Sequence, residues 1–223
     1  MIDQDQLICT LKNPPIQGRA DLRQDILALA LTGFKRGGYF VEFGALDGIT
    51  GSNTYILEKD YGWTGIVAEA ARVWQDKVQQ HRSCHCDFRA VAAHSGQNLI
   101  FKETDVQLGL SGLVDFFDEK EYHARRRAAS TGAHYEVATV SLNDLLHQYK
   151  APDYIDYISM DTEGSEPAIL NTFDFSRRRV GLWTIEHNYF DRARNQMLEI
   201  MTANGYQRLL PELSTIDDWY IPA

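Results

Sequence analysis

Short runs of apolar residues recur along the chain and alternate with longer segments of helical spacing. The first two runs, residues 39–43 and 65–68, are rich in β-formers and have the length of buried strands. Three further runs of this kind follow. This alternation predicts an α/β fold with a mostly parallel sheet flanked by helices. The further expected strands are residues 83–88, 154–160 and 180–185, and the expected helices are residues 71–81, 140–147 and 192–203.

The two ends of the chain depart from this alternation. Residues 1–37 are expected to form an N-terminal helical lead-in, in which residues 1–20 are polar and wrap the surface and residues 22–31 form a helix that packs on the sheet. Residues 206–210 and 216–221 are expected to form a closing antiparallel pair. Because no internal repeat or Pro/Gly-rich linker interrupts the 223 residues, we interpret them as one domain with a full core.

The stretch from residue 38 to residue 69 carries the first candidate chemistry. A strand, a glycine loop, the start of a helix and a second strand that ends on Glu69 follow one another, which is the order of a nucleotide-type site at the carboxyl edge of a parallel sheet. A carboxylate at that tip can accept hydrogen bonds from both ribose hydroxyls. The loop lacks Gly-x-Gly-x-x-Gly, and Glu42 and Asp47 would repel a pyrophosphate. S-adenosylmethionine (SAM), a cationic ligand without phosphate, fits these charges.

Two motifs resemble the FkbM-type SAM-dependent methyltransferases. The first runs from Val41-Glu-Phe-Gly-Ala-Leu-Asp-Gly48 through Ser52-Asn-Thr54, Leu57-Glu-Lys59 and Gly62-Trp63 to Glu69, and the second is Ile155-Asp-Tyr-Ile-Ser-Met-Asp-Thr-Glu-Gly-Ser-Glu166. The resemblance covers residues 38–190 and implies a Rossmann-like class I methyltransferase fold, a mostly parallel seven-stranded sheet whose final strand is reversed. The second strand of the family ends in Glu-Pro, whereas this chain has Glu69-Ala70.

The resemblance also implies which residues hold the cofactor. The glycine loop would line the methionine end of SAM, and the Ser-Asn-Thr cluster after it would support the loop. Glu69 would hold the ribose, and the turn after the third strand would flank the adenine. The expected cofactor-binding residues are Glu42, Gly44, Ala45, Asp47, Gly48, Ser52, Asn53, Thr54, Glu69, Ala70, Asp87, Phe88, Ala90 and Asp161.

Polar residues at the ends of the fourth and fifth expected strands form a second candidate site. Asp161 ends one strand and Glu186-His187 ends the next, so these side chains should converge beside the methyl group. The arrangement resembles the divalent-metal site of catechol-type O-methyltransferases. It implies Asp161, Glu186 and His187 as catalytic residues and as ligands of a magnesium or manganese ion that lowers the pKa of an acceptor hydroxyl, with Asn188 as a further donor. Without a metal, His187 is the expected general base; its alternative is a histidine bonded to a nearby backbone group.

Residues 103–136 form the least regular part of the chain. One interpretation is a mobile lid or acceptor-binding insertion over the cofactor. The alternative is a solvated helix whose arginines, residues 125–127, pair with nearby carboxylates. Ser111 is a candidate ligand contact, since a Ser-Gly-Leu recurs here in the family.

Charge and composition exclude some classes of binding partner. The net charge of −9 disfavours nucleic acid, whose binding rests on lysine and arginine contacts. No apolar stretch approaches the roughly 20 residues of a membrane span. The first residues lack the features of a signal peptide, and the odd count of three cysteines suggests reduced thiols, so we expect a cytoplasmic protein. The oligomeric state is left open.

These observations together favour a SAM-dependent O-methyltransferase that acts on a hydroxyl of a sugar, a glycan or a related small metabolite. One alternative is a nucleotide-binding oxidoreductase or epimerase on the same sheet. Another is a catalytically inactive binding module. The missing Gly-x-Gly-x-x-Gly weighs against the first alternative, and the presence of both motif sets weighs against the second.

Overall fold

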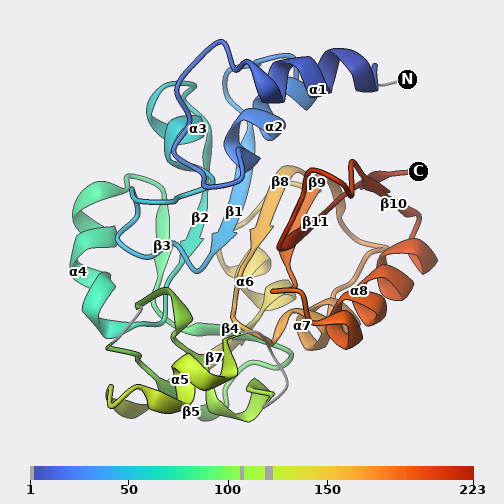
Figure 1. Ribbon diagram of the computed structural model, residues 1–223. Helices are drawn as coiled ribbons and strands as arrows, with labels where there is room; N and C mark the ends of the chain where they lie inside the picture. Colours follow the sequence, from blue (N-terminus) through green and yellow to red (C-terminus); the bar gives the residue numbers. More distant parts are fainter. Residues whose placement is uncertain (1–2, 106–107, 119–122) are drawn as a thin grey trace.

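The computed structural model describes residues 3–105, 108–118 and 123–223 (Figure 1). Its large sheet has seven strands in the order β10-β11-β9-β8-β1-β2-β3, and a small sheet has four in the order β4-β7-β5-β6. The strands of the large sheet are β1 Tyr39–Phe43, β2 Thr64–Ala68, β3 His85–Asp87, β8 Tyr154–Met160, β9 Arg179–Glu186, β10 Tyr206–Leu209 and β11 Asp217–Pro222. The helices are α1 Gln4–Lys12, α2 Gln24–Leu31, α3 Tyr55–Lys59, α4 Arg72–His81, α5 Ala124–Ala129, α6 Leu142–Gln148, α7 Glu166–Thr172 and α8 Asp191–Ala203, with 3-10 turns η1 Leu108–Leu110 and η2 Val114–Phe116.

The large sheet is mixed. Strands β3, β2, β1, β8 and β9 pair in parallel, so their carboxyl ends share one edge. Strand β11 runs antiparallel to both β9 and β10. The expected mostly parallel sheet with a reversed final strand is therefore confirmed, although β11 lies inside the sheet between β9 and β10.

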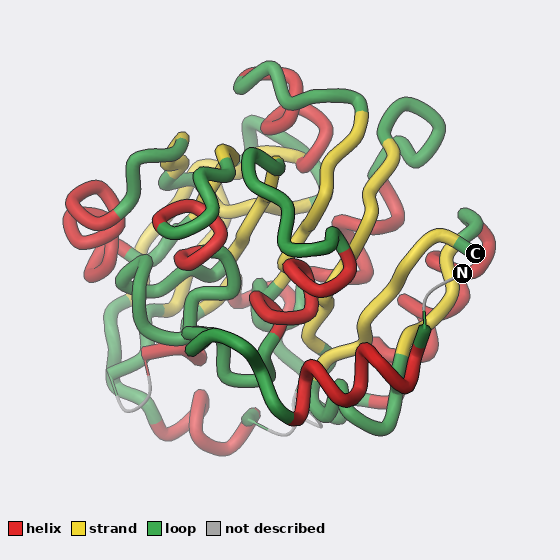
Figure 2. The backbone as a smooth tube through the Cα atoms, turned by 90° about the horizontal axis from the view of Figure 1, so that it is seen from above, coloured by secondary structure: helices red, strands yellow, loops and turns green. Residues whose placement is uncertain are grey.

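Alternating side chains of these strands fill two cores, one on each face of the sheet. Phe40 and Tyr157 pack with α1, α2, α3 and α4 in one core. Their neighbours Val41 and Ile158 pack with α6, α7 and α8 in the other. The period of two follows from the pleat, which turns successive side chains to opposite faces. Seen from above, helices lie on both sides of the strands (Figure 2).

The small sheet stands beside the carboxyl ends of β1 and β2 (Figure 1). Strands at 98–102 and around 136–140 were expected singly; they are β5 Asn98–Lys102 and part of β7 His134–Ser141. Their association with β4 Ala90–Ala92 and β6 Gly112–Leu113 was not expected. A third, smaller apolar cluster joins this sheet to the end of β2 through Ala70, Phe101 and Leu113.

The expectation that residues 1–20 only wrap the surface is wrong. They contain α1, in which Leu7 and Leu11 are each 5% exposed and pack in the same core as α2. Asp3 caps this helix by accepting a hydrogen bond from the backbone N–H of Gln6 at 3.1 Å. Two buried residues four apart were a weak signal, because a nine-residue helix shows barely two turns of periodicity.

The helices expected at 71–81, 140–147 and 192–203 are confirmed with small shifts of their ends. Ser141 caps α6 as expected, since its hydroxyl accepts from the N–H of Asp144 at 3.1 Å. Among the described residues, no helix combines the length and the apolar character that crossing a lipid bilayer requires.

Candidate active site

A cavity lies at the carboxyl edge of the large sheet, where Phe43 of β1, Ala68 of β2 and Asp161 after β8 line it. We call it the first cavity. The loop after β1 borders it at Gly44, which has φ +73°; a Cβ there would lie 2.2 Å from the backbone oxygen of Asp161, so only glycine fits. Of the expected cofactor residues, five line this cavity: Gly44, Glu69, Ala70, Ala90 and Asp161.

Glu69 stands at the tip of β2 and lines the first cavity. Its carboxylate accepts from the backbone N–H of Ala71 at 2.8 Å and of Leu46 at 2.9 Å, which ties the loop after β1 to the end of β2. Burial raises the pKa of Glu69 to about 7, and the nearby Asp161 and Glu42 add to the rise. The carboxylate is oriented by the backbone and has no cationic partner among its described hydrogen bonds.

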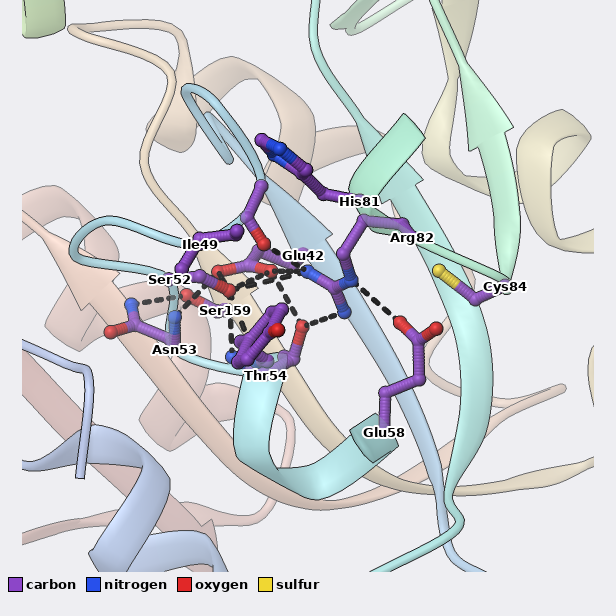
Figure 3. Close-up of polar contacts among 12 residues, drawn as sticks. Glu42, Ile49, Ser52, Asn53, Thr54, Glu58, His81, Arg82, Cys84 and Ser159 are labelled. Carbon is purple, nitrogen blue, oxygen red and sulfur yellow. Dashed lines mark hydrogen bonds and ion pairs between the residues drawn. The ribbon is translucent and has the colours of Figure 1, made fainter. Parts of the chain in front are cut away.

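Glu42 lies beneath the loop and lines none of the cavities described here. Its carboxylate is 2% exposed and accepts from the hydroxyls of Ser52 and Thr54 and from the N–H of Asn53, at 3.0, 2.5 and 2.6 Å. Arg82 donates to it at 3.1 Å (Figure 3). The geometry gives Glu42 the task of fixing the Ser-Asn-Thr cluster rather than facing a ligand. Asn53 alone of that cluster reaches a cavity, the third one described below.

Arg82 is the centre of this network. It follows α4, and its side chain has no exposed surface. It binds Glu58 at 2.6 Å as well as Glu42 (Figure 3). Burial alone would raise the pKa of Glu58, but the charge and hydrogen bond of Arg82 hold it at about 2. The sequence did not single out Arg82, because an arginine just after a helix is usually a surface charge.

Other residues expected at the methionine end are engaged within the loop itself. The Asp47 carboxylate accepts from the N–H groups of Ile49 and Thr50 at 2.9 and 2.7 Å. Ala45 is 1% exposed in the core, and Gly48 lies against Arg82. None of these three lines a cavity described here, and their contacts with a cofactor stay predictions.

The turn after β3, expected to flank the adenine, borders the first cavity. Ala90 and Arg89 line it, whereas Asp87 lies behind them. The Asp87 carboxylate binds Arg89 at 2.5 Å and accepts from the hydroxyl of Tyr149 at 3.1 Å. Phe88 packs against the apolar core on the α1–α4 face. The structure thus brings Ala90 to the cavity and gives Asp87 and Phe88 supporting positions.

Asp161, Glu163 and Glu186 bring carboxylate oxygens within 4.8 Å of one another. We call them the acidic cluster. The Asp161 and Glu186 carboxyls lie beside each other, and burial raises the pKa of both, that of Asp161 to about 7. The side-chain amide of Asn188 donates to Glu186 at 2.7 Å and to Glu163 at 3.3 Å, while its buried Oδ1 has no hydrogen-bond partner among the described residues. Mutual repulsion and burial favour a shared proton or a bound cation here.

The expected roles of His187 as metal ligand and general base do not agree with the structure. Its Nδ1 accepts from the N–H of Tyr189 at 3.0 Å, and its Nε2 therefore donates to the backbone oxygen of Asp217 at 3.0 Å. Burial lowers its pKa, which keeps the ring neutral. The backbone alternative holds, and Glu163 takes the place of His187 beside Asp161 and Glu186.

Glu166 begins α7 and accepts from the N–H groups of Thr162 and Gly164, at 2.7 and 2.9 Å. It thereby holds the loop of the second motif in shape. Glu163, by contrast, is bound by Arg127 of α5 at 2.6 Å. Of the three arginines in the expected charge run, this one is buried, and the solvated-helix interpretation is wrong for it.

Two further cavities meet the first at the acidic cluster. The second cavity, about 400 Å³, lies between η2 and the start of α8 and is lined by Glu163, Glu186 and Asn188. The third, about 430 Å³, lies on the side of α2 and is lined by Asn53, Asp161, Glu186 and Asp217. Asp161 borders the first and third cavities, and Glu186 borders the second and third. A group bound at Asp161 would thus be reached from the first and the third cavity, and Glu186 connects the third cavity with the second.

Part of the insertion at 103–136 covers the first cavity. Ser111 and Leu113 of this segment line the cavity, together with Phe101 of β5. Residues 106–107 and 119–122 of the expected insertion lie outside the described residues. The described part therefore supplies a wall of the cavity, with Ser111 in the position expected of a ligand contact.

The sequence matches the model of a known protein family. The sequence model of the Methyltransferase FkbM domain matches residues 42–208, most of the chain. No curated protein matches the sequence.

Three solved structures resemble this chain. A mutant of MtNAS is 11% identical, with a TM-score of 0.40, 87% of this chain covered and 57% of the other, so this chain spans little more than half of it. A precorrin-6y C5,15-methyltransferase from Geobacter metallireducens GS-15 is 11% identical, with 88% and 85% covered and a TM-score of 0.43. A SAM-dependent methyltransferase from Aquifex aeolicus is 10% identical, with 99% and 98% covered and a TM-score of 0.42.

Proposed function

Because the chain belongs to the FkbM family of SAM-dependent methyltransferases, we propose that it transfers the SAM methyl group to a hydroxyl of a sugar, a glycan or a related small metabolite. One observation carries the proposal. Gly44, Glu69 and Asp161, which come from the ends of three parallel strands, border a single cavity. A ligand in this cavity lies close to the backbone at Gly44, to the Glu69 carboxylate, which can accept from ribose hydroxyls, and to the acid Asp161.

In this proposal the first cavity takes the adenosine part of SAM. Glu69 accepts hydrogen bonds from the ribose hydroxyls, for which its two backbone bonds orient it. Ala70, Ala90 and Val91 give the adenine a flat apolar contact. The sulfonium lies toward Asp161, whose carboxylate compensates its charge.

The acceptor reaches the methyl group from the second or third cavity. The acceptor oxygen attacks the methyl carbon in line, the carbon–sulfur bond breaks, and S-adenosylhomocysteine (SAH) leaves as the neutral thioether. The hydroxyl proton passes to the Asp161–Glu186 pair, because a carboxyl with a pKa near 7 suits a general base at neutral pH. Alignment of acceptor and methyl supplies much of the remaining rate.

A divalent cation is a separate part of the proposal, with Glu163 replacing the expected His187 among its ligands. Three carboxylates and the Oδ1 of Asn188 are oxygen donors of the type that magnesium and manganese prefer. When bound, such an ion would lower the pKa of an acceptor hydroxyl. If it is needed, EDTA abolishes turnover and added magnesium or manganese restores it; turnover that is insensitive to EDTA leaves the Asp161–Glu186 pair as the base.

The test of the proposed function is calorimetric titration of SAM, SAH and NAD into the wild-type protein and Glu69→Gln. Wild type should bind SAM and SAH at one site and NAD not at all. Glu69→Gln should weaken SAH roughly tenfold or more, since a buried bond to a charged group contributes about 1.5–3 kcal/mol. Glu199→Gln, a change on the outer side of α8, is the matched control. Binding of NAD instead would favour the oxidoreductase alternative, and SAM binding without turnover of any acceptor would favour the inactive module.

A further inference from the structure

Arg127 differs from the two arginines that precede it in the sequence. Arg125 and Arg126 are exposed, whereas Arg127 is 2% exposed. All three lie in α5, a helix of six residues. A buried guanidinium persists only when charge and hydrogen bonds compensate its loss of water, so its partners show what it holds together.

These partners come from two different segments. Arg127 binds the Glu163 carboxylate at 2.6 Å, in the loop after β8. Its Nε donates to the backbone oxygen of Leu110 at 2.9 Å, and its guanidinium lies 4.0 Å from the centre of the Phe117 ring. Leu110 and Phe117 belong to residues 108–118, which we call the roof segment. One side chain thus joins the roof segment to the loop that carries the acidic cluster.

The roof segment and this loop also approach each other at two glycines. A Cβ at Gly112 would lie 2.9 Å from the Phe117 ring and 3.2 Å from the Cβ of Glu163. A Cβ at Gly164 would lie 2.7 Å from the backbone oxygen of Phe116. Such close contact leaves little freedom in how the two segments dock, so the docked arrangement is specific.

Both segments supply walls of the proposed active site. Ser111 and Leu113 of the roof segment line the first cavity, and Glu163 lines the second. Arg127 itself lines neither of these two cavities. Any effect of Arg127 on ligand binding must therefore pass through the segments that it joins.

We propose that Arg127 is a positioning residue, which docks the roof segment on the loop after β8 and thereby sets the affinity for SAM and SAH without touching them. This inference rests on the proposed function of the first cavity. Arg127 also holds Glu163 in place beside Asp161 and Glu186, since Glu163 shares its carboxylate between Arg127 and Asn188.

The test compares wild type, Arg127→Gln, Arg127→Lys and Arg125→Gln by calorimetric titration with SAH, well below each melting temperature. Arg127→Gln should weaken SAH binding roughly tenfold or more. Breaking a buried ion pair costs more free energy than a tenfold change in affinity corresponds to. Arg127→Lys should recover only part of the lost SAH affinity. Its ammonium is a point charge and cannot bind Glu163 and Leu110 in the same geometry. Arg125→Gln should bind SAH as wild type does.

A second readout is independent of any ligand. In the free protein, hydrogen exchange of residues 108–118 should be faster in Arg127→Gln than in wild type, while exchange in α8 is unchanged. If the wild type fails to bind SAH, the proposed function is wrong, and the exchange measurement still decides whether Arg127 docks the roof segment.

Glu163→Gln and the double variant complete the test. If the pair acts as a unit, the double variant should bind SAH no more weakly than Arg127→Gln alone. A merely structural Arg127 would lower the melting temperature and leave SAH affinity and roof exchange unchanged, and that result would overturn the proposal. If Arg127→Gln fails to fold, Arg127→Lys and Glu163→Gln are compared with wild type in its place. The proposal is also overturned if both of these variants show wild-type SAH affinity and wild-type exchange of residues 108–118.

Discussion

Two groups of carboxylates differ in whether the protein supplies them with a cation. Glu42 and Glu58 share Arg82, and the pKa of Glu58 is held at about 2. Asp161 and Glu186 are half-buried and have no cationic partner among the described contacts, and the pKa of each is raised. The first group is thus compensated by a buried arginine, and the second is not.

The difference indicates which group is structural and which is functional. A compensated, fully hydrogen-bonded network can only stabilise the loop that it supports. Buried acids that lack a cation are costly to the folded protein and are retained where a ligand supplies the missing charge. In the proposed function SAM brings a sulfonium and an ammonium, and the uncompensated group is then the proposed side of the cavity for methyl transfer.

Removal of Arg82 should have the largest effect, because it leaves the buried Glu42 without a cation and Glu58 with only the partly exposed Lys59. We expect Arg82→Met to lower the free energy of unfolding by about 3–5 kcal/mol. Urea denaturation measures it, and Arg177→Met, an exposed change, is the control. A loss below about 1 kcal/mol would show that the network is not needed for stability.

Neutralising Asp161 should lower turnover without lowering stability, the opposite of the effect expected for Arg82. Asp161→Asn should lower turnover by about a hundredfold or more, the usual contribution of a general base. Its thermal stability should equal or exceed that of wild type, since the variant removes the charge of a half-buried acid that has no cationic partner among the described contacts. A large loss of stability with retained turnover would assign Asp161 to the structural group.

The pH dependence of stability should differ in sign between Glu58, which Arg82 compensates, and Glu69, which has no cationic partner among its described hydrogen bonds. The pKa of Glu69 is raised to about 7 from 4.5, so its contribution is full below about pH 4.5 and is lost as the pH rises through 7. The pKa of Glu58 is lowered to about 2, so its contribution is present above pH 4.5 and is lost as the pH falls toward 2.

Melting of the free protein between pH 5 and pH 8 measures the first of these changes. The melting temperature should fall by several degrees over that range, at about 2–4 °C per kcal/mol for a chain of this size. Glu69→Gln should flatten part of the slope. A wild-type melting temperature that rises from pH 5 to pH 8 would contradict the raised pKa of Glu69.

Ser111 should give the smallest effect. It lines the first cavity, and its hydroxyl accepts from the N–H of Thr104 at 3.0 Å. Ser111→Ala should weaken SAH by no more than about 1 kcal/mol, the range of a single neutral hydrogen bond. A loss as large as that of Glu69→Gln would make Ser111 a principal cofactor contact.

A feature of this fold could be predicted from the sequence where a short stretch of the chain contains the signal for it. Glu69 and Asp161 end apolar runs, and the ends of parallel strands share one edge, so their meeting in one cavity was foreseeable. The Ser141 cap was foreseeable for the same reason, since its partner lies three residues away. The swap of His187 for Glu163 was not, because it depends on which backbone groups surround the ring.

Arg82 and Arg127 show the limit most clearly. Their carboxylate partners lie 40 and 36 positions away in the sequence, and no local pattern marks either pair. Arg127 even stands in a run of three arginines that is typical of a solvent face. Helical geometry can bury one residue of such a run and expose its neighbours, but a six-residue helix carries too little periodicity to show which one.

The most direct test of the proposed site is calorimetric titration of SAM and SAH at pH 7 in two buffers of different ionisation enthalpy. We expect saturable binding of both at one site, with net proton release for SAM that exceeds that for SAH. The extra protons come from the raised carboxyls, because the sulfonium favours their charged forms. Absence of saturable binding, or equal proton release for the two ligands, would contradict the claim that the uncompensated acids face the transferred methyl group.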